Sequence, residues 1–399
     1  LKERISMLKR NVAILVAMAL IVMTLSSCGE VSKSKMEDNF ASISQPVVEY
    51  VYSFDATTIL TDSGEVYTWG SNERGSLGQG LPLDVDTKIP QRVPFEEKIV
   101  QINGRCSSDA LCAVSENGSV YAWGTNDFGL IPSDEYAVCS PVKIPFDEKV
   151  SNAKISHRFF IIQTESGDAY FMGWDMSGPL FESNKELYRE SSITTFEMVK
   201  LPETEKVKEI ETSDLYAAVL TQAGNVYVFG LLPSVVDTMN PTRIDVTEPI
   251  MQIGPLYNGI VLLGESGQLY FQGSDDYFIV SNEQKEYAEV AKINSVTDVR
   301  RIKTSGGTII AQTKTNDLYV WGYNPRYNCA QSREEYVVTP QMVELPKIPY
   351  KLFCGEFNIT VIGNEGIYTW GSNYRNQFLN PDKENTFTPQ KIELSDIIE

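Results

Sequence analysis

One phrase, Gly-x-Val-Tyr-x-Trp-Gly, recurs seven times along this 399-residue chain and restricts its fold more than any other feature. The first copy runs from Gly64 to Gly70 and the last from Gly366 to Gly371. All seven copies keep the tyrosine and the final glycine, and the tyrosines stand 43 to 57 residues apart at Tyr67, Tyr121, Tyr170, Tyr227, Tyr270, Tyr319 and Tyr368. A period of this length indicates an array of small, similar structural units.

Each unit has the same internal order of strand and turn signals. An alternating apolar run such as Ala217–Thr221 precedes the phrase, and a turn such as Asp62-Ser63-Gly64 separates the two, which predicts a hairpin. A Pro-x-x-Val or Pro-x-x-Ile marker follows in most units, as at Pro90–Val93, and a further apolar run, as at Ile99–Ile102, opens the next unit. The pattern predicts four strands per unit.

Seven four-stranded units of about fifty residues predict an all-β fold, the seven-bladed β-propeller. A single unit cannot bury both faces of its sheet, whereas sheets packed in a ring can. The alternatives are a right-handed β-solenoid, whose rungs are usually shorter, and two separate all-β domains, for which no linker is evident between units.

The amino-terminal segment has the pattern of an export signal. Lys9 and Arg10 precede an apolar run, Val12–Leu25, which is shorter than the roughly 20 residues of a membrane-spanning helix. The run ends in Leu25-Ser26-Ser27-Cys28 and thereby resembles a bacterial lipoprotein signal, in which the cysteine receives diacylglycerol. The alternative is an ordinary secretory signal with a chance cysteine.

This resemblance implies three segments and a location. Residues 1–27 are expected to form the signal peptide, residues 28–45 a flexible tether after lipidated Cys28, and residues 46–399 the propeller. The mature protein is then expected to be anchored at the extracytoplasmic face of a bacterial membrane.

Charge and cysteine content exclude several classes of function. With 53 acidic and 34 basic residues the net charge is −19, which disfavours nucleic-acid partners. If Cys28 is lipidated, an odd number of scattered cysteines remains, so no disulfide framework is implied. His157 is the only histidine, and no Cys-x-x-Cys is present, so neither a zinc site nor another metal site is expected.

The residues after the phrase identify the type of repeat. The first unit continues Gly70-Ser71-Asn72-Glu73-Arg74-Gly75-Ser76-Leu77-Gly78. This resembles the regulator-of-chromosome-condensation repeat, Gly-x-Val-Tyr-x-Trp-Gly-x-Asn-x-x-Gly-Gln-Leu-Gly, over about residues 46 to 396. The resemblance implies a seven-bladed propeller but no single function, because the family includes nuclear nucleotide-exchange factors, regulatory domains of large ligases and secreted bacterial inhibitors of β-lactamase.

The chain departs from that family where a histidine usually precedes the second strand of each unit. The seven equivalent positions hold Ala56, Ala110, Phe159, Tyr216, Gly259, Thr308 and Asn358. Because no motif for exchange activity is present either, the resemblance does not carry that activity to this chain.

No catalytic constellation is evident in the sequence. A nucleophile–histidine arrangement has only His157 to draw on, and no phosphate-binding loop is present, so no cofactor is expected. A carboxylate pair for glycoside cleavage depends on the fold rather than on sequence spacing. The acids at Asp84-Val85-Asp86 and Asp275-Asp276 are interpreted as solvated loop residues rather than calcium ligands, and the repeated Tyr and Trp as core.

Aromatic residues that the repeat does not require occur in the loops after the Trp-Gly positions. They are Trp174, Tyr277, Phe278, Tyr323, Tyr327, Tyr374 and Phe378. Equivalent loops of a propeller emerge on one face, and exposed aromatics are typical of protein-binding hot spots. We expect a non-catalytic, cell-surface protein-binding propeller. The alternatives are local packing of these rings and, for the function, a carbohydrate-active or other hydrolytic propeller enzyme acting on the cell envelope.

Overall fold

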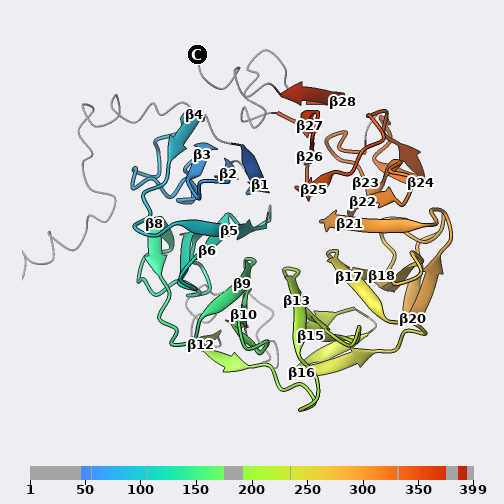
Figure 1. Cartoon of the computed structure of the whole chain (residues 1–399), viewed down its shortest axis with the longest axis horizontal. Coiled ribbons are helices and arrows are strands. Elements are labelled where there is room, and N and C mark those ends of the chain that lie inside the picture. The colour runs from blue at the N-terminus through green and yellow to red at the C-terminus, as the bar shows by residue number, and fades with distance from the viewer. Residues whose placement is uncertain are drawn as a thin grey trace, which may run out of the picture.

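The computed structural model describes residues 46–54, 56–105, 107–174, 192–233, 235–329, 332–373 and 385–392, and these form a ring of seven antiparallel sheets (Figure 1). Each sheet holds four strands in chain order, from the innermost at the ring axis to the outermost at the rim. The expected seven-bladed β-propeller is confirmed, and so is the count of four strands in each unit.

The blades follow one another around the ring in chain order. Blades 1 to 4 consist of β1 (Val47–Tyr52), β2 (Ala56–Thr61), β3 (Val66–Gly70) and β4 (Thr87–Arg92); β5 (Ile99–Gly104), β6 (Ala110–Ser115), β7 (Val120–Thr125) and β8 (Ala137–Lys143); β9 (Val150–Ile155), β10 (Phe159–Thr164), β11 (Ala169–Trp174) and β12 (Ser192–Met198); and β13 (Val207–Thr212), β14 (Tyr216–Thr221), β15 (Val226–Leu232) and β16 (Val236–Ile244). Blades 5 to 7 consist of β17 (Ile250–Pro255), β18 (Gly259–Gly264), β19 (Leu269–Ser274) and β20 (Glu286–Ile293); β21 (Val299–Ser305), β22 (Thr308–Thr313), β23 (Leu318–Tyr323) and β24 (Tyr336–Met342); and β25 (Lys351–Cys354), β26 (Asn358–Gly363), β27 (Gly366–Ser372) and β28 (Asn385–Ile392).

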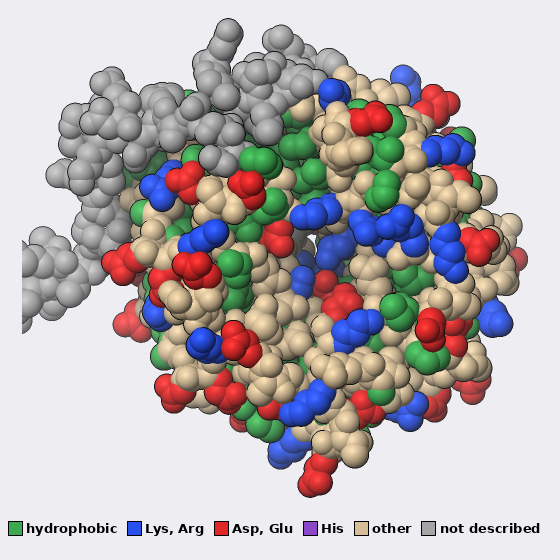
Figure 2. Space-filling model, viewed as in Figure 1, with side chains coloured by type: hydrophobic (Ala, Val, Ile, Leu, Met, Phe, Trp, Pro, Cys, Tyr) green, Lys and Arg blue, Asp and Glu red, His purple; other side chains and the backbone are tan. Residues whose placement is uncertain are grey.

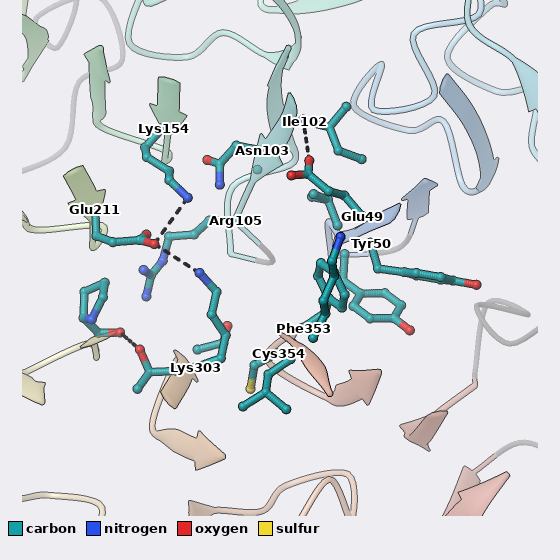
Figure 3. Close-up of a pocket in the computed structure, with 18 of the residues that line it drawn as sticks. Glu49, Tyr50, Ile102, Asn103, Arg105, Lys154, Glu211, Lys303, Phe353 and Cys354 are labelled. Carbon is teal, nitrogen blue, oxygen red and sulfur yellow. Dashed lines mark hydrogen bonds and ion pairs between the residues drawn. The ribbon is translucent and has the colours of Figure 1, made fainter. Parts of the chain in front are cut away.

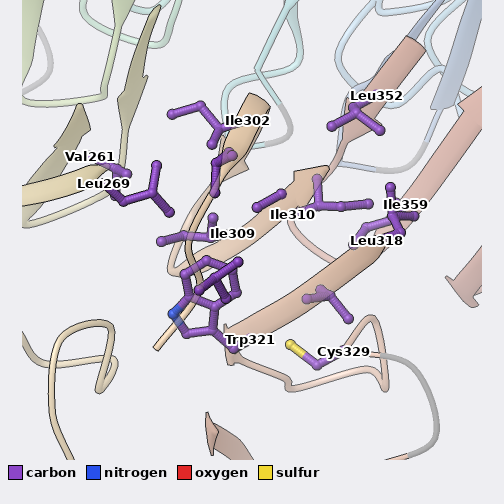
Figure 4. Close-up of a cluster of buried hydrophobic side chains, with 14 of the residues drawn as sticks. Val261, Leu269, Ile302, Ile309, Ile310, Leu318, Trp321, Cys329, Leu352 and Ile359 are labelled. Carbon is purple, nitrogen blue, oxygen red and sulfur yellow. The ribbon is translucent and has the colours of Figure 1, made fainter. Parts of the chain in front are cut away.

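The second strand of most blades is buried along its whole length, as in β6, β14 and β18. Such a strand is covered on both faces by neighbouring blades, so its sequence reads as a continuous apolar run rather than as strict alternation. The outermost strand, for example β20, is mostly exposed. The core therefore lies between the blades, and Figure 4 shows one such layer, in which Trp321 and Ile309 pack with residues of the adjoining blades.

The tryptophans of blades 2, 6 and 7 connect each of these blades to the preceding one. Trp69, Trp123, Trp321 and Trp370 are fully buried, which confirms their interpretation as core. The indole Nε1–H of Trp123 donates to the carbonyl of Ser76 at 3.0 Å, in the loop between β3 and β4 of the preceding blade. Trp321 donates in the same way to Ile279 at 3.2 Å, and Trp370 to Asn328 at 2.7 Å. The tryptophan of the repeated phrase therefore holds a loop of the preceding blade in addition to filling the core.

The glycine after the tryptophan is required by a close approach of backbone. Gly124 has a φ of +93°, and a Cβ added there would lie 2.0 Å from the carbonyl oxygen of Asp109. The same contact recurs at Gly322, where a Cβ would lie 2.2 Å from the oxygen of Gly307. Only glycine fits both the conformation and the space.

The ring closes without exchange of strands between the first and last blades among the described residues, because β1 to β4 and β25 to β28 each form a sheet of their own. The two blades meet through side chains. The Tyr50 and Phe353 rings lie 6.3 Å apart, the Phe54 and Phe357 rings 5.9 Å apart, and the hydroxyl of Tyr52 contacts that of Thr360 at 2.5 Å.

The cysteines of the described residues agree with the sequence interpretation. Cys112 is fully buried in β6, as expected of a small hydrophobic side chain, and Cys139, Cys329 and Cys354 are likewise unbridged. Cys28 and Cys106 lie outside the described residues. Within the described part of the chain, no helix is long and apolar enough to cross a membrane.

We predict that Gly124→Ala lowers the free energy of unfolding by roughly 3 kcal/mol or more, because the methyl group collides with the Asp109 carbonyl. Gly167→Ala is the matched control. Gly167 has a similar φ of +82°, but its nearest neighbour is the Lys206 side chain at 3.4 Å, so only the backbone strain of about 1 kcal/mol applies. Chemical denaturation measures both variants, and equal losses would contradict the steric explanation.

Candidate functional site

The loops predicted to carry function emerge on one face of the ring. In an antiparallel sheet of four consecutive strands, the connection between the first and second strands lies at the same edge as that between the third and fourth. The β17–β18, β19–β20 and β23–β24 connections therefore share a face. Tyr277 and Phe278 lie in the second of these connections and Tyr327 in the third, and Tyr323 ends β23 beside it.

Five aromatic rings from blades 5 and 6 form a continuous cluster on this face, here called the aromatic face: Tyr257, Tyr277, Phe278, Tyr323 and Tyr336. The Tyr277 ring lies 6.2 Å from Tyr257 and 5.5 Å from Tyr323. Tyr336 lies 5.6 Å from Tyr323 and 5.3 Å from Phe278. All five side chains are partly exposed, so the cluster is open to solvent along its length.

Carboxylates border the aromatic face. Burial, and then the nearby Asp276, raises the pKa of Tyr277 to about 12, with Glu356 also contributing. The pKa of Tyr323 is raised as well, by burial and then by Tyr336, Glu335 and Glu356. The tyrosines therefore remain neutral hydroxyls in an acidic setting, which suits contact with a surface that presents both apolar and basic groups.

The outcome for the aromatic residues singled out from the sequence is mixed. Tyr277, Phe278 and Tyr323 come together as expected, whereas Tyr327 packs against Phe387 of the last blade at 4.4 Å. Tyr277 also packs on Gly307, where a Cβ would lie 2.5 Å from its ring, so local packing accounts for part of this surface. Tyr374, Phe378 and the side chain of Trp174 lie outside the described residues.

Sequence analysis missed Tyr257 and Tyr336, which complete the cluster. Neither lies in the segment immediately after a Trp-Gly position: Tyr257 is in the loop between β17 and β18, and Tyr336 begins β24. Both residues lie at strand ends on the same edge of their sheets as the loops after the Trp-Gly positions, and this placement could have identified them from the sequence.

The interpretation of Asp275 as a solvated loop acid was wrong. This residue is fully buried, and its carboxylate accepts hydrogen bonds from the backbone N–H groups of Ile279 at 2.5 Å and Val280 at 3.0 Å. It occupies the place that Asn72 and Asn324 hold in their blades, where the amide oxygen accepts from Leu77 and Cys329. The polar residue two positions after the phrase thus organises the loop, and in blade 5 a carboxylate performs this task.

A second feature, the central channel, was not anticipated from the sequence. The innermost strands place two residues of each blade in equivalent register along the axis. The first ring holds Glu49, Gln101, Asn152, Glu209, Gln252, Arg301 and Lys351. The second ring holds Val51, Asn103, Lys154, Glu211, Gly254, Lys303 and Phe353. Most of these residues line a cavity of about 370 Å³.

Several side chains of the channel join adjacent blades. Glu49 accepts from the backbone N–H of Ile102 at 2.8 Å, Gln101 from Ala153 at 3.1 Å and Gln252 from Ile302 at 2.8 Å. These N–H groups belong to the inner edge strand of the next blade, which has no neighbouring strand at the axis. The channel side chains therefore satisfy an edge that would otherwise be open.

Glu211 forms the electrostatic centre of the channel (Figure 3). Its Oε1 lies 3.3 Å from the Nζ of Lys154 and 3.1 Å from the Nζ of Lys303. Burial would raise the pKa of this carboxyl, but the two ammonium groups outweigh it and hold the pKa at about 2. Burial and then the charge of Glu211 raise the pKa of the neighbouring Glu209 to about 7.

Nothing in the described residues assembles a metal site, since no group of three or more histidine, cysteine, aspartate or glutamate side chains stands close enough to hold an ion. His157, the only histidine, lies 3.3 Å from Asp127 and packs edge-on against Phe128, so its contacts are with neighbouring loop residues of the preceding blade.

Comparison with known proteins supports the repeat type. Two models of the Regulator of chromosome condensation (RCC1) repeat match residues 63–108 and 99–130. The human protein named Regulator of chromosome condensation is 21% identical over 341 residues, which are 78% of this chain and 80% of that protein. The Ultraviolet-B receptor UVR8 of Arabidopsis thaliana is 25% identical over 294 residues, 69% of this chain and 65% of the receptor.

Solved structures show the same fold. Human WBSCR16 superposes with a TM-score of 0.69 at 18% identity and covers 82% of this chain and 94% of its own. Prp20p of Saccharomyces cerevisiae, whose structure was described with its binding to Gsp1p and histones, gives a TM-score of 0.69 at 18% identity over 91% of this chain and 90% of its own.

Proposed function

We propose that this seven-bladed propeller, whose repeats are of the regulator-of-chromosome-condensation type, binds another protein through its aromatic face and performs no catalytic step. The observation that carries the proposal is the clustering of Tyr257, Tyr277, Phe278, Tyr323 and Tyr336 with solvent access. Tyrosine-rich, partly exposed clusters supply large contact areas at low entropic cost.

The relatives support binding as the general role. Yeast RCC1 (Prp20) is described bound to Kap60, and Prp20p is described with its binding to Gsp1p and histones. These partners belong to those proteins. For this chain the proposal is limited to a protein partner with apolar and basic groups, because Asp276, Glu335 and Glu356 border the rings.

The alternative, a hydrolytic propeller enzyme, would use carboxylates in the central channel. Glu211 is engaged by two ammonium groups, and Glu49 accepts a backbone N–H from the next blade. A carboxylate occupied in this way is a poor nucleophile or proton donor. Glu209, with its pKa raised to about 7, would suit a proton donor, but glycoside cleavage needs two carboxylates. Because the contacts of Glu211 and Glu49 leave neither available as the second carboxylate, the channel favours binding over glycoside cleavage.

We further propose that the propeller is held at the extracytoplasmic face of a bacterial membrane by a lipid on Cys28. The support is the sequence alone: a basic start at Lys9 and Arg10, a short apolar run, and Leu25-Ser26-Ser27-Cys28. A lipid anchor would leave the channel and the loop face free for soluble partners.

The partner-binding proposal predicts that Tyr323→Ala/Tyr336→Ala reduces capture of the partner at least tenfold, because two adjacent rings are removed from the middle of the cluster. Tyr136→Ala is the matched control, since Tyr136 is 59% exposed in the equivalent loop of blade 2 but lies outside the cluster. Quantitative pull-down from envelope extracts compares the three proteins. Undiminished capture by the double variant, or no specific partner of the unmodified chain, would refute the proposal.

The anchor is tested separately by Cys28→Ser. The variant is expected to leave the membrane fraction almost completely, since a serine hydroxyl does not accept the lipid, while its thermal unfolding stays unchanged. Membrane fractionation with incorporation of labelled palmitate measures the release, and thermal denaturation of the purified variant measures its stability. Retention of the variant in membranes at the level of the unmodified chain would show that Cys28 is not the anchor.

A further inference from the structure

The central channel concentrates positive charge in a protein whose net charge is −19. The cavity lining includes five cations, Arg105, Lys154, Arg301, Lys303 and Lys351, against two carboxylates, Glu49 and Glu211, and the first ring adds a third carboxylate, Glu209. In the view of Figure 2, basic side chains gather around much of the central opening, a few acidic ones lie beside it, and further acidic side chains are spread over the rim. Hydrogen bonds between the inner strands of neighbouring blades require polar side chains but no net positive charge.

Three of these cations, Arg105, Arg301 and Lys351, form no ion pair within the described residues, although the charge of Lys351 still acts on Glu49 and that of Arg105 on Glu356. The ion pairs of the channel involve only Lys154 and Lys303, both with Glu211. Arg301 donates to the backbone carbonyl of Tyr350, and Lys351 donates to that of Val48 at 3.3 Å. Burial and then the neighbouring Arg300 lower the pKa of Arg301, which is the effect expected of a cation with no nearby anion.

Arg105 adds an unused donor. Its Nη1 donates to the carbonyl of Thr212, while its Nη2 is buried without a hydrogen-bond partner in the described structure. Buried unpaired donors are costly, and they are commonly found where a ligand completes the site. Lys154 and Lys303 also have N–H groups that Glu211 does not use, because each ammonium has three N–H groups and Glu211 accepts from one of them.

The cations are distributed unevenly around the axis. Arg301 and Lys303 come from β21 and Lys351 from β25, so blades 6 and 7 form the basic wall. Glu209 and Glu211 both come from β13 in blade 4. Blade 5 contributes only Gly254 to the second ring, and the Nζ of Lys303 in blade 6 reaches the Oε1 of Glu211 in blade 4 at 3.1 Å. The cavity of about 370 Å³ is within the size range of small-molecule sites.

We propose that the central channel binds a small polyanion bearing carboxylate or phosphate groups. Its ligands are the five cations of the lining, Arg105, Lys154, Arg301, Lys303 and Lys351. This site is separate from the aromatic face and does not depend on the protein-binding proposal. Two observations carry the proposal: an excess of cations, half-buried except for the exposed Lys351, and the open volume beside them.

Isothermal titration of the full chain with pyrophosphate and with citrate tests the site, and glycerol serves as the neutral control probe. Both anions are expected to bind, and added salt is expected to weaken them. Binding of pyrophosphate alone assigns a phosphate ligand and binding of citrate alone a carboxylate ligand. Absence of binding by both anions at millimolar concentration would overturn the proposal.

The Lys303→Gln/Lys351→Gln variant is expected to raise the dissociation constant at least tenfold. The single variant Lys351→Gln, whose ammonium is exposed and makes one backbone contact, is expected to raise it about threefold without affecting folding. Lys143→Gln is the matched control, because Lys143 pairs with Glu97 away from the channel and its loss leaves the channel unchanged. Equal affinity of the double variant and the control would overturn the proposal.

Discussion

The hydrogen bond from a buried indole to the loop of the preceding blade is the interaction on which the rest of the structure depends. It is formed by Trp123, Trp321 and Trp370. Each bond joins the core of one blade to the loop between the third and fourth strands of the preceding blade. Because the same side chain also fills the layer between blades, packing and loop geometry are fixed together. In blades 3, 4 and 5 the position is held by Met172, Phe229 and Gln272, which pack without an indole donor.

Blade 5 shows how the aromatic face is built from such contacts. Its loop between β19 and β20 is held from within by buried Asp275 and from the next blade by Trp321. Tyr277 and Phe278 stand on this loop, and Tyr323 and Tyr336 come from the blade that supplies the tryptophan. The aromatic face is therefore a consequence of the repeat, although its rings are not part of the repeated phrase.

The fold could be predicted from the sequence because each residue of the repeated phrase has a structural role at a fixed position in the blade. Tyr, Trp and Gly recur at fixed offsets, and each offset corresponds to a packing or conformational requirement, such as the close approach at Gly124. The channel was not predicted because Glu211 and Lys303 resemble ordinary polar positions of a strand. That these two residues face the channel becomes evident only when the first strands of all seven units are aligned. Asp275 was misjudged because its chemical type suggests solvent, while its place in the repeat required a buried acceptor.

Hydrogen exchange of Trp321→Phe tests the central claim most directly. The phenylalanine keeps most of the buried ring but removes the donor to Ile279. Exchange of the amides in residues 275–281 of the preceding blade is expected to accelerate several-fold, while residues 72–78, held by Trp123, stay unchanged. Unchanged exchange in residues 275–281, or an equal increase in both loops, would contradict the account.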